Sequence, residues 1–274
     1  MAIAAEDFRY ITELVREQSA IVLEAGKEYL VETRLGPVAT QAGLPSLAAL
    51  VSDLRMRRTP GLLQKVVDAM TTNETSFFRD VSPFEHLKKR VFPDLIAKRK
   101  NEKRLSIWCA AASTGQETYS MLMLLKENFP ELATWNLQYL ATDISTQVLA
   151  KAREGAYTQL EVNRGLPAPL LIKYFKKRGL EWQVDESLRS MVTFREFNLA
   201  AKNWGPMGQF DLIMLRNVMI YFDLPTKRTI LANMRRVMRP DGYLFLGTAE
   251  TTINVDDNFG SDTFHTACYR LKAA

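Results

Sequence analysis

The chain has 274 residues, of which 47% are hydrophobic and 24% are charged, a composition typical of a globular protein. The length suits one large domain, or one large and one small, and needs no disulfide or metal to complete the core. There is no secretory signal pattern and no run of about 18 apolar residues, which argues against a transmembrane helix. We expect a cytoplasmic protein whose two cysteines, Cys109 and Cys268, are buried and reduced.

The formal net charge of +5 is concentrated in one part of the chain. Residues 79–104 hold nine basic and four acidic side chains. A field of this sign attracts an acidic macromolecule, although solvated helix faces carry similar charge without any partner. No RNA-binding or DNA-binding motif accompanies the basic residues, so we expect no nucleic-acid partner.

Residues 1–70 predict a small domain made only of helices. Apolar residues recur at helical spacing in four segments, which are 8–15, 27–39, 47–56 and 62–70. Gly36-Pro37 is expected to interrupt the second segment, and Ser46 is a candidate N-cap for the third.

From Arg104 onward, apolar strands alternate with helices. The predicted strands are 105–109, 137–141, 210–215 and 243–246, and the predicted helices are 119–125, 145–153 and 224–238. This alternation indicates an α/β domain with a parallel sheet and helices on both faces. Residues 180–197 depart from it and predict a small antiparallel β insertion.

The segment WCAAASTGQETYS, residues 108–120, leads from a strand through small residues into a helix. Small side chains and a helix N-terminus beyond a parallel strand favour a nucleotide-like ligand, because a ligand can approach the backbone there. A tight turn without a ligand is the alternative. The loop has neither GxGxxG nor GxxxxGK[ST], which argues against a dinucleotide or a nucleoside triphosphate.

Asp143 follows the second strand, where a carboxylate is well placed to accept hydrogen bonds from both ribose hydroxyls of an adenosine. The alternative is a helix N-cap. Two further segments carry polar groups among aromatic residues. LRNVMIYFD, residues 215–223, follows the third strand, and TTNETSFFRD, residues 71–80, joins the helical domain to the sheet. Without a ligand, the first segment is explained as an interface turn whose apolar residues pack inward, and the second as a helix cap followed by a buried aromatic pair.

Metal-dependent and nucleophilic chemistry lack support in the sequence. The two histidines, His86 and His265, lie outside the motif loops, and no Cys, His or acidic residues cluster at the spacing of metal ligands. We expect no metal site and no Ser-His-Asp triad.

Together these motifs resemble the CheR family of chemotaxis receptor methyltransferases, over nearly the whole chain. The resemblance rests on TNETSFFRD, WCAAASTGQETYS, ATDIS, FNL at 197–199 and LRNVMIYFD, in that order. It implies a class I S-adenosylmethionine-dependent methyltransferase sheet with helices on both faces, a small antiparallel β insertion and an all-helical N-terminal domain. The expected divisions are a helical domain at 1–70, a linker at 71–90, and a methyltransferase domain at 91–274 with its insertion at about 178–195.

The resemblance also implies the residues of the site. Those that contact S-adenosylmethionine would be Asn73, Thr75, Arg79, Glu117, Asp143, Asn198, Leu199, Arg216 and Asn217. Arg79 and Tyr221 would lie nearest the methyl transfer and act as catalytic residues. Gln116 and Thr118 depart from the common family loop, as do Leu215 and the stretch at 247–250.

The reaction implied is methylation of glutamate side chains on bacterial chemoreceptors, giving methyl esters and S-adenosylhomocysteine. A glutamate is already ionised at neutral pH, so its attack on a sulfonium methyl needs no general base. We expect a monomer that binds the cytoplasmic domain of the receptor, does not insert into the membrane, and can also bind a receptor C-terminal peptide at the β insertion. Two alternatives are a nucleic-acid methyltransferase, suggested by the pI of about 9.1, and a non-catalytic sensor of the methyl donor.

Overall fold

The computed structural model describes residues 3–272, which divide into two compact units. Of the described residues, one unit comprises 3–72 together with 221–226, and the other comprises 73–220 and 227–272. In the described residues no helix has the length and apolar character needed to cross a membrane.

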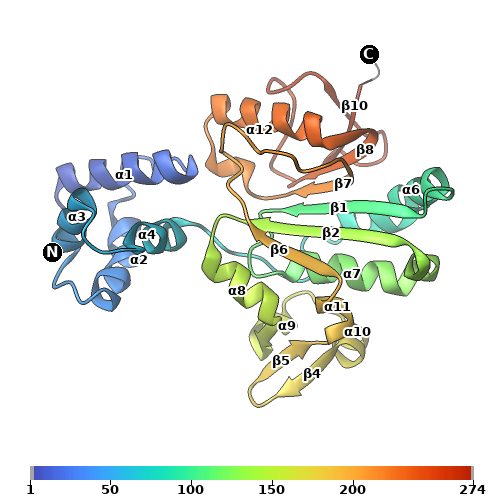
Figure 1. Cartoon of the computed structure of the whole chain (residues 1–274), viewed down its shortest axis with the longest axis horizontal. Coiled ribbons are helices and arrows are strands. Elements are labelled where there is room, and N and C mark those ends of the chain that lie inside the picture. Colours follow the sequence, from blue (N-terminus) through green and yellow to red (C-terminus); the bar gives the residue numbers. More distant parts are fainter. Residues whose placement is uncertain (1–2, 273–274) are drawn as a thin grey trace. The chain divides into compact units, whose positions relative to one another are not determined.

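Four helices build the smaller unit (Figure 1). They are α1 (Ala5–Ser19), α2 (Glu28–Gln41), α3 (Leu47–Met56) and α4 (Leu62–Met70). Their apolar stripes meet in one core, in which Ile11, Val15, Val31 and Leu35 are completely buried. The predicted cap is confirmed, because the Ser46 side chain accepts a hydrogen bond from the Ala49 N–H at 3.1 Å.

The predicted break at Gly36-Pro37 is wrong, because α2 continues through Pro37 to Gln41. Proline removes one N–H from the helix, so the Thr33 carbonyl, four residues earlier, loses its usual helical donor, but the helix continues. Packing of Leu35, Val38 and Ala39 in the core keeps the last turn helical.

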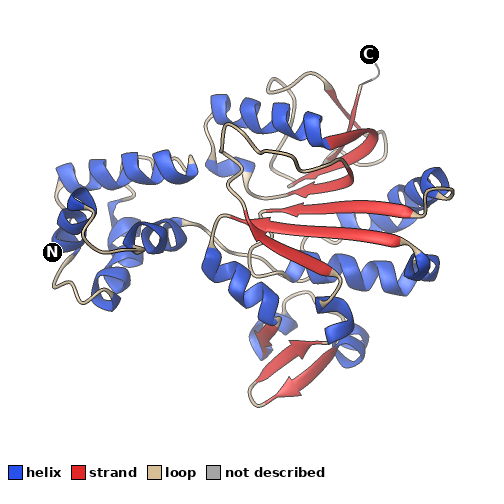
Figure 2. Ribbon diagram, in the orientation of Figure 1, coloured by secondary structure: helices blue, strands red, loops and turns tan. Residues whose placement is uncertain are grey.

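The larger unit is built around a seven-stranded sheet with the order β6-β2-β1-β7-β8-β10-β9 (Figures 1 and 2). The strands are β1 (Arg104–Ala110), β2 (Asn136–Asp143), β6 (Val192–Glu196), β7 (Phe210–Leu215), β8 (Met238–Leu246), β9 (Phe259–Ser261) and β10 (Cys268–Leu271). The first five strands of this order pair in parallel, whereas β10 is antiparallel to both β8 and β9. The predicted parallel sheet is therefore confirmed.

Both faces of the central strands are buried. Leu105, Ile107 and Cys109 of β1 belong to a core shared with α6 (Phe92–Arg99) and α7 (Gln116–Asn128). Because side chains alternate along a strand, Trp108 lies on the opposite face, where its ring packs against Trp204 with centroids 5.4 Å apart. The remaining helical elements of this unit are α5 (Ser82–His86), η1 (Leu87–Val91), η2 (Pro130–Thr134), α8 (Thr146–Glu154), α9 (Gln159–Asn163), α10 (Ala168–Tyr174), α11 (Glu186–Arg189), and most of both η3 (Met219–Tyr221) and α12 (Leu224–Val237).

A buried ion cluster joins α6 to the start of two strands. The Arg99 guanidinium donates from Nε to Asp211 at 2.6 Å and from Nη2 to Asp241 at 2.6 Å. Asp211 is completely buried, and it also accepts the Ser106 N–H at 2.8 Å. Hydrogen bonds to the two carboxylates raise the pKa of Arg99, and the Arg99 guanidinium lowers the pKa of Asp241.

The β insertion is present, but its predicted strands were partly wrong. A three-stranded antiparallel sheet forms from β3 (Ala156–Thr158), β5 (Glu181–Val184) and β4 (Phe175–Arg178), in that order. Residues 192–196 instead form β6, which pairs in parallel with β2 at the edge of the main sheet. An edge strand is only partly covered, so its sequence, VTFRE, lacks the continuous apolar run that marks a central parallel strand.

Candidate functional site

The polar motifs gather because their strands are neighbours. β2, β1 and β7 are adjacent and parallel, so the loops that follow them lie along one edge of the sheet. These loops carry Asp143, the segment 111–115 and Arg216-Asn217. The structure therefore brings three of the predicted segments to the same edge.

The loop between β1 and α7 has a strained backbone. Ala111 and Ser113 adopt left-handed conformations, with φ of 60° and 51°, which non-glycine residues rarely adopt. Hydrogen bonds from the second strand stabilise this path. The Ala112 N–H donates to the Thr142 carbonyl at 2.8 Å, and the Ser113 N–H donates to the Asp143 carboxylate at 2.9 Å. Strain of this kind is found where a backbone is shaped for a ligand.

Gly115 is required for a different reason than close approach of a ligand. Its φ of 96° disfavours any side chain, and a Cβ there would meet Tyr157 Oη at 3.0 Å and Ala152 Cβ at 3.1 Å. The glycine thus lets the start of α7 pack against Tyr157 and Ala152.

Asp143 links two of the loops. Its carboxylate accepts the Ser113 N–H at 2.9 Å and the Ser145 N–H at 3.0 Å, and the residue is only 8% exposed. The N-cap of α8 is Ser145, whose side chain accepts from Val148, so the N-cap alternative for Asp143 is wrong. The buried carboxylate at the end of β2 therefore holds the 111–115 loop and the start of α8 together.

Arg216 is the centre of a buried charge network at the end of β7. Its Nη1 donates to Glu117 Oε2 at 2.5 Å, and its Nη2 donates to Asp80 Oδ2 at 2.9 Å and to the Arg79 carbonyl at 3.0 Å. The Arg216 side chain is 1% exposed. Because one guanidinium contacts α7 and the 73–80 segment together, it fixes three of the predicted motifs relative to one another.

One N–H donor of the Arg216 guanidinium is not used by this network. Within residues 3–272, the buried Nε of Arg216 has no hydrogen-bond partner. An unsatisfied buried donor is costly, and a ligand oxygen would remove that cost. The carboxylate of an amino-acid ligand has such an oxygen, so this residue fits the methionine portion of S-adenosylmethionine.

The 73–80 segment belongs to the same part of the site. The Asn73 carbonyl accepts the Ser113 hydroxyl at 2.8 Å, and the Arg79 guanidinium donates to the Glu74 carbonyl at 3.0 Å. Thr75 is half-buried. Asp80 has a left-handed φ of 59°, and its carboxylate is held by Arg216. The hydrogen bond to the Glu74 carbonyl thus holds the Arg79 side chain against its own segment.

Asn198 and Leu199 follow β6 and lie close to the end of β2. The Phe197 N–H donates to the Asp143 carbonyl at 2.8 Å, which positions the next residues beside that strand end. Asn198 Oδ1 accepts the Ala200 N–H at 2.9 Å, and the Leu199 carbonyl accepts the Trp204 indole N–H at 3.2 Å. Leu199 is buried. Its side chain is therefore suited to an apolar contact.

Sequence reasoning missed Glu250, which organises the loop after β7. Its buried carboxylate accepts backbone N–H groups from Asn217 and Val218, each at 2.8 Å, and from Gly247 at 2.6 Å. A Cβ at Gly247 would meet Glu250 Oε2 at 2.7 Å, so the glycine is needed for this approach. The sequence feature that could have revealed Glu250 is its GxxE spacing from Gly247, in a stretch that departs from the family pattern.

Tyr221 belongs to the helical unit rather than to the sheet unit. Within that unit its carbonyl accepts the Val22 N–H at 3.0 Å. The next residues are held similarly, since the Asp223 carboxylate pairs with Arg16 at 2.7 Å.

The two buried thiols are unsuited to nucleophilic chemistry, and the two imidazoles pack against each other. Burial raises the pKa of both Cys109 and Cys268, so each stays protonated, and both are free cysteines as predicted. Burial lowers the pKa of His86 and of His265, which pack ring to ring with centroids 5.2 Å apart. No group of three His, Cys, Asp or Glu side chains suited to a metal occurs in the described chain.

Comparison with known proteins identifies two domains of the chain. Residues 73–267 match the family model described as the SAM-binding domain of CheR methyltransferase, and residues 6–71 match that of its all-alpha domain. The chain is 42% identical to chemotaxis protein methyltransferase 1 of Pseudomonas aeruginosa, which covers 94% of this chain and 95% of that protein. It is 39% identical to chemotaxis protein methyltransferase Cher2 of Pseudomonas putida, with coverage of 92% and 93%. Chemotaxis protein methyltransferase 1 of Vibrio cholerae is 37% identical, with coverage of 94% of both chains.

These matches confirm the predicted resemblance, the class I methyltransferase fold and S-adenosylmethionine as the ligand. The sheet edge described above lies entirely within the matched SAM-binding domain.

Proposed function

Because the chain belongs to the CheR family of methyltransferases, we propose that it methylates glutamate side chains of bacterial chemoreceptors. The products would be glutamyl methyl esters and S-adenosylhomocysteine. The observation that carries the proposal is the buried Arg216 network, whose spare donor suits an amino-acid carboxylate at the end of a methyltransferase sheet.

We assign the binding of the methyl donor to the residues around that network. They are Asn73, Thr75, Arg79, Glu117, Asp143, Asn198, Leu199, Arg216 and Asn217. Arg216 supports the proposal most directly, because Glu117 and Asp80 fix its guanidinium while its Nε stays available. Asp143 would hold the ribose, and Leu199 would contact the base.

The acceptor chemistry needs little from the protein. A glutamate carboxylate, with a pKa near 4.3, is ionised at neutral pH and is itself the nucleophile. The donor supplies an electrophilic methyl group when it is bound. The protein aligns the two and excludes water, which favours a reaction in which opposite charges neutralise. We assign Arg79 and Tyr221 to orienting the incoming carboxylate and the methionine portion.

Acidic receptor helices would be attracted by basic side chains. Arg57 and Arg58 of the helical unit are exposed, as are Lys88, Lys89 and Arg90. Attraction of this kind weakens with added salt. The β insertion offers a second contact, because β4 is an edge strand with exposed Lys176 and Lys177 and an extended peptide adds to such an edge.

The proposal is tested by methyl transfer from isotope-labelled S-adenosylmethionine to membranes that contain a chemoreceptor. We expect label in the receptor band that mild base releases as methanol, which identifies a carboxyl ester. Receptor with alanine at its methylated glutamates serves as the matched control. Label in RNA would support a nucleic-acid methyltransferase instead, and donor binding without transfer would indicate a sensor.

A further inference from the structure

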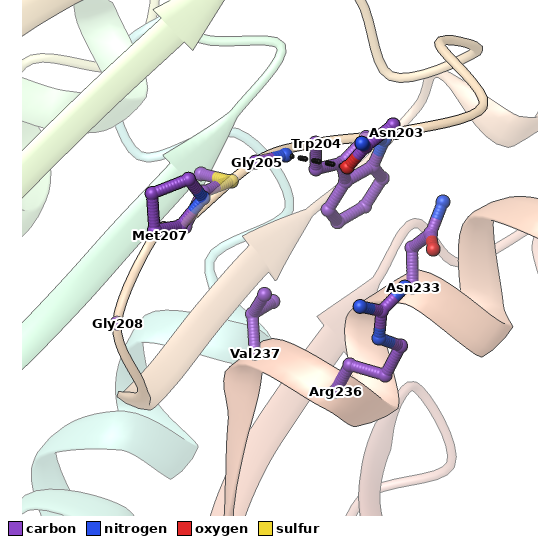
Figure 3. A pocket seen from close by; sticks show the side chains of 9 residues that line it. Asn203, Trp204, Gly205, Met207, Gly208, Asn233, Arg236 and Val237 are labelled. Atoms are coloured by element: carbon purple, nitrogen blue, oxygen red, sulfur yellow. Dashed lines mark hydrogen bonds between the residues drawn. The ribbon is translucent and has the colours of Figure 1, made fainter.

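A pocket lies in the sheet unit between the 203–208 loop and α12 (Figure 3). Its volume is about 200 Å³. Asn233, Arg236 and Val237 line it from the helix, and Trp204 lines it from the loop. It shares no residue with those assigned above to the methyl donor.

The helix side of this pocket presents two hydrogen-bond donors. Asn233 is 8% exposed, and among the described residues its Nδ2 has no hydrogen-bond partner. Arg236 is exposed and forms no ion pair within residues 3–272. The two residues are three positions apart on α12 and therefore share a face, and Figure 3 shows both side chains extending toward the loop.

The loop side of the pocket is fixed in place. Asn203 Oδ1 accepts the Gly205 N–H at 2.9 Å, and Gly205 and Gly208 have left-handed φ values of 63° and 79°. The Trp204 ring packs edge-on against the buried Trp108, and its indole N–H donates to the Leu199 carbonyl. Hydrogen bonds and a ring contact thus hold the wall of the pocket opposite α12.

We infer that this pocket binds a carboxylate group, held by the Asn233 amide and the Arg236 guanidinium. A guanidinium matches the two oxygens of a carboxylate, and the amide N–H gains the partner that it otherwise lacks. The space is too small for a second nucleotide, since pockets for such ligands measure about 300–1,000 Å³. It fits a ligand the size of a glutamate side chain, either as part of a free dicarboxylate or as an acidic residue of a bound protein.

The indole N–H resonance of Trp204 reports on occupancy. The chain has four tryptophans, so the other three are internal controls in a spectrum of protein labelled with ¹⁵N-tryptophan. Trp204→Phe assigns the signal. The probes are sodium succinate, the capped peptide acetyl-Gly-Glu-Gly-amide, and neutral succinamide at matched ionic strength.

We expect a saturable shift of the Trp204 signal with a carboxylate probe and none with succinamide. Arg236→Gln should raise the dissociation constant at least about tenfold, and Arg228→Gln, which removes an exposed charge from the same helix, should leave it unchanged. Asn233→Leu should weaken binding similarly.

The two carboxylate probes separate the sources of the ligand. Saturation by succinate alone indicates a free dicarboxylate, and saturation by the glutamyl peptide indicates an acidic protein side chain. The inference is overturned if neither probe gives a saturable shift, or if Arg236→Gln and Arg228→Gln respond alike. Succinamide binding as tightly as succinate would also overturn it.

Discussion

The buried side-chain carboxylate of Glu250 accepts a hydrogen bond from the backbone N–H of Asn217 at 2.8 Å. Asn217 has a left-handed φ of 58°, a conformation that asparagine adopts more readily than most other residues. Because Glu250 also accepts the Val218 N–H, it sets the conformation of the loop that carries Arg216.

The first prediction concerns this carboxylate. Glu250→Gln replaces one acceptor oxygen by an NH₂ group that faces backbone donors, so at least one N–H loses its partner. We expect the free energy of unfolding to fall by about 1–3 kcal/mol and the affinity for S-adenosylmethionine to decrease. Chemical denaturation and calorimetric titration measure the two effects. Asp257→Asn, at an exposed position, is the control, and an unchanged donor affinity in Glu250→Gln would argue against a positioning role.

The second prediction concerns the pair between Glu117 and Arg216. Glu117→Gln leaves the buried guanidinium without part of its counter-charge, and we expect a loss of about 3 kcal/mol in stability with weaker donor binding. Glu127 lies on α7 like Glu117 but forms an exposed ion pair, with Lys173 of α10, and for Glu127→Gln we expect a loss of at most about 1 kcal/mol in stability. Equal losses in the two variants would show that burial of the Arg216 pair is unimportant.

These two carboxylates also show how far sequence reasoning reached. Glu117 lies in the segment 108–120, at the start of α7. The apolar residues of the strand before it and of the helix itself follow clear patterns, so the location of Glu117 was predictable. Glu250 lies 33 positions from Asn217, and only the pairing of β7 with β8 brings their loops together. A register of that kind depends on packing over the whole sheet, which a local pattern does not encode.

The β insertion was predicted correctly, but the prediction of its strands was wrong in part for a related reason. Residues 192–196 have the mixed polarity of an antiparallel strand, yet they cover the edge of the parallel sheet beside β2. Polarity reports how much of a strand is covered and not the direction of its neighbour. The strand 156–158 was missed because three residues give too short a pattern to recognise.

The third prediction concerns Gly115. Glycine-to-alanine substitution here forces a Cβ to within 3.0 Å of Tyr157 Oη at a φ of 96°, and we expect a loss of at least about 2 kcal/mol in unfolding free energy. Gly179→Ala is the matched control in the same unit, because its φ is also left-handed but no atom lies within 4 Å of the new Cβ. If Gly115→Ala is no more destabilising than Gly179→Ala, the close packing is not what requires glycine.

The fourth prediction concerns pH. Burial lowers the pKa of His86, and the nearby His265 and Arg90 lower it further, whereas Asp262 opposes them. The unfolded chain therefore binds more protons below the ordinary histidine pKa of 6.5, so stability is complete above that pH and falls as the pH drops. Acidic groups such as Asp185, with a pKa of about 2, lose their contribution only at lower pH.

Denaturation between pH 7.5 and pH 5 measures this dependence. We expect His86→Leu to have a shallower decline of unfolding free energy over that range than the unaltered chain. The comparison is of slopes, so it stands even if the variant is less stable at every pH. Identical slopes would exclude His86 as a source of the dependence.

The fifth prediction concerns Tyr221, assigned above to orientation of the reacting groups. Tyr221→Phe removes one hydroxyl and keeps the ring, so we expect turnover to fall by about tenfold or more while the affinity for S-adenosylmethionine is largely retained. Tyr29→Phe, at a side chain that is 61% exposed in the same unit, controls for loss of a tyrosine hydroxyl. Methyl transfer and calorimetric titration on both variants separate chemistry from binding. Wild-type turnover in Tyr221→Phe would remove the tyrosine from the mechanism, and a parallel loss of donor affinity would make it a binding residue instead.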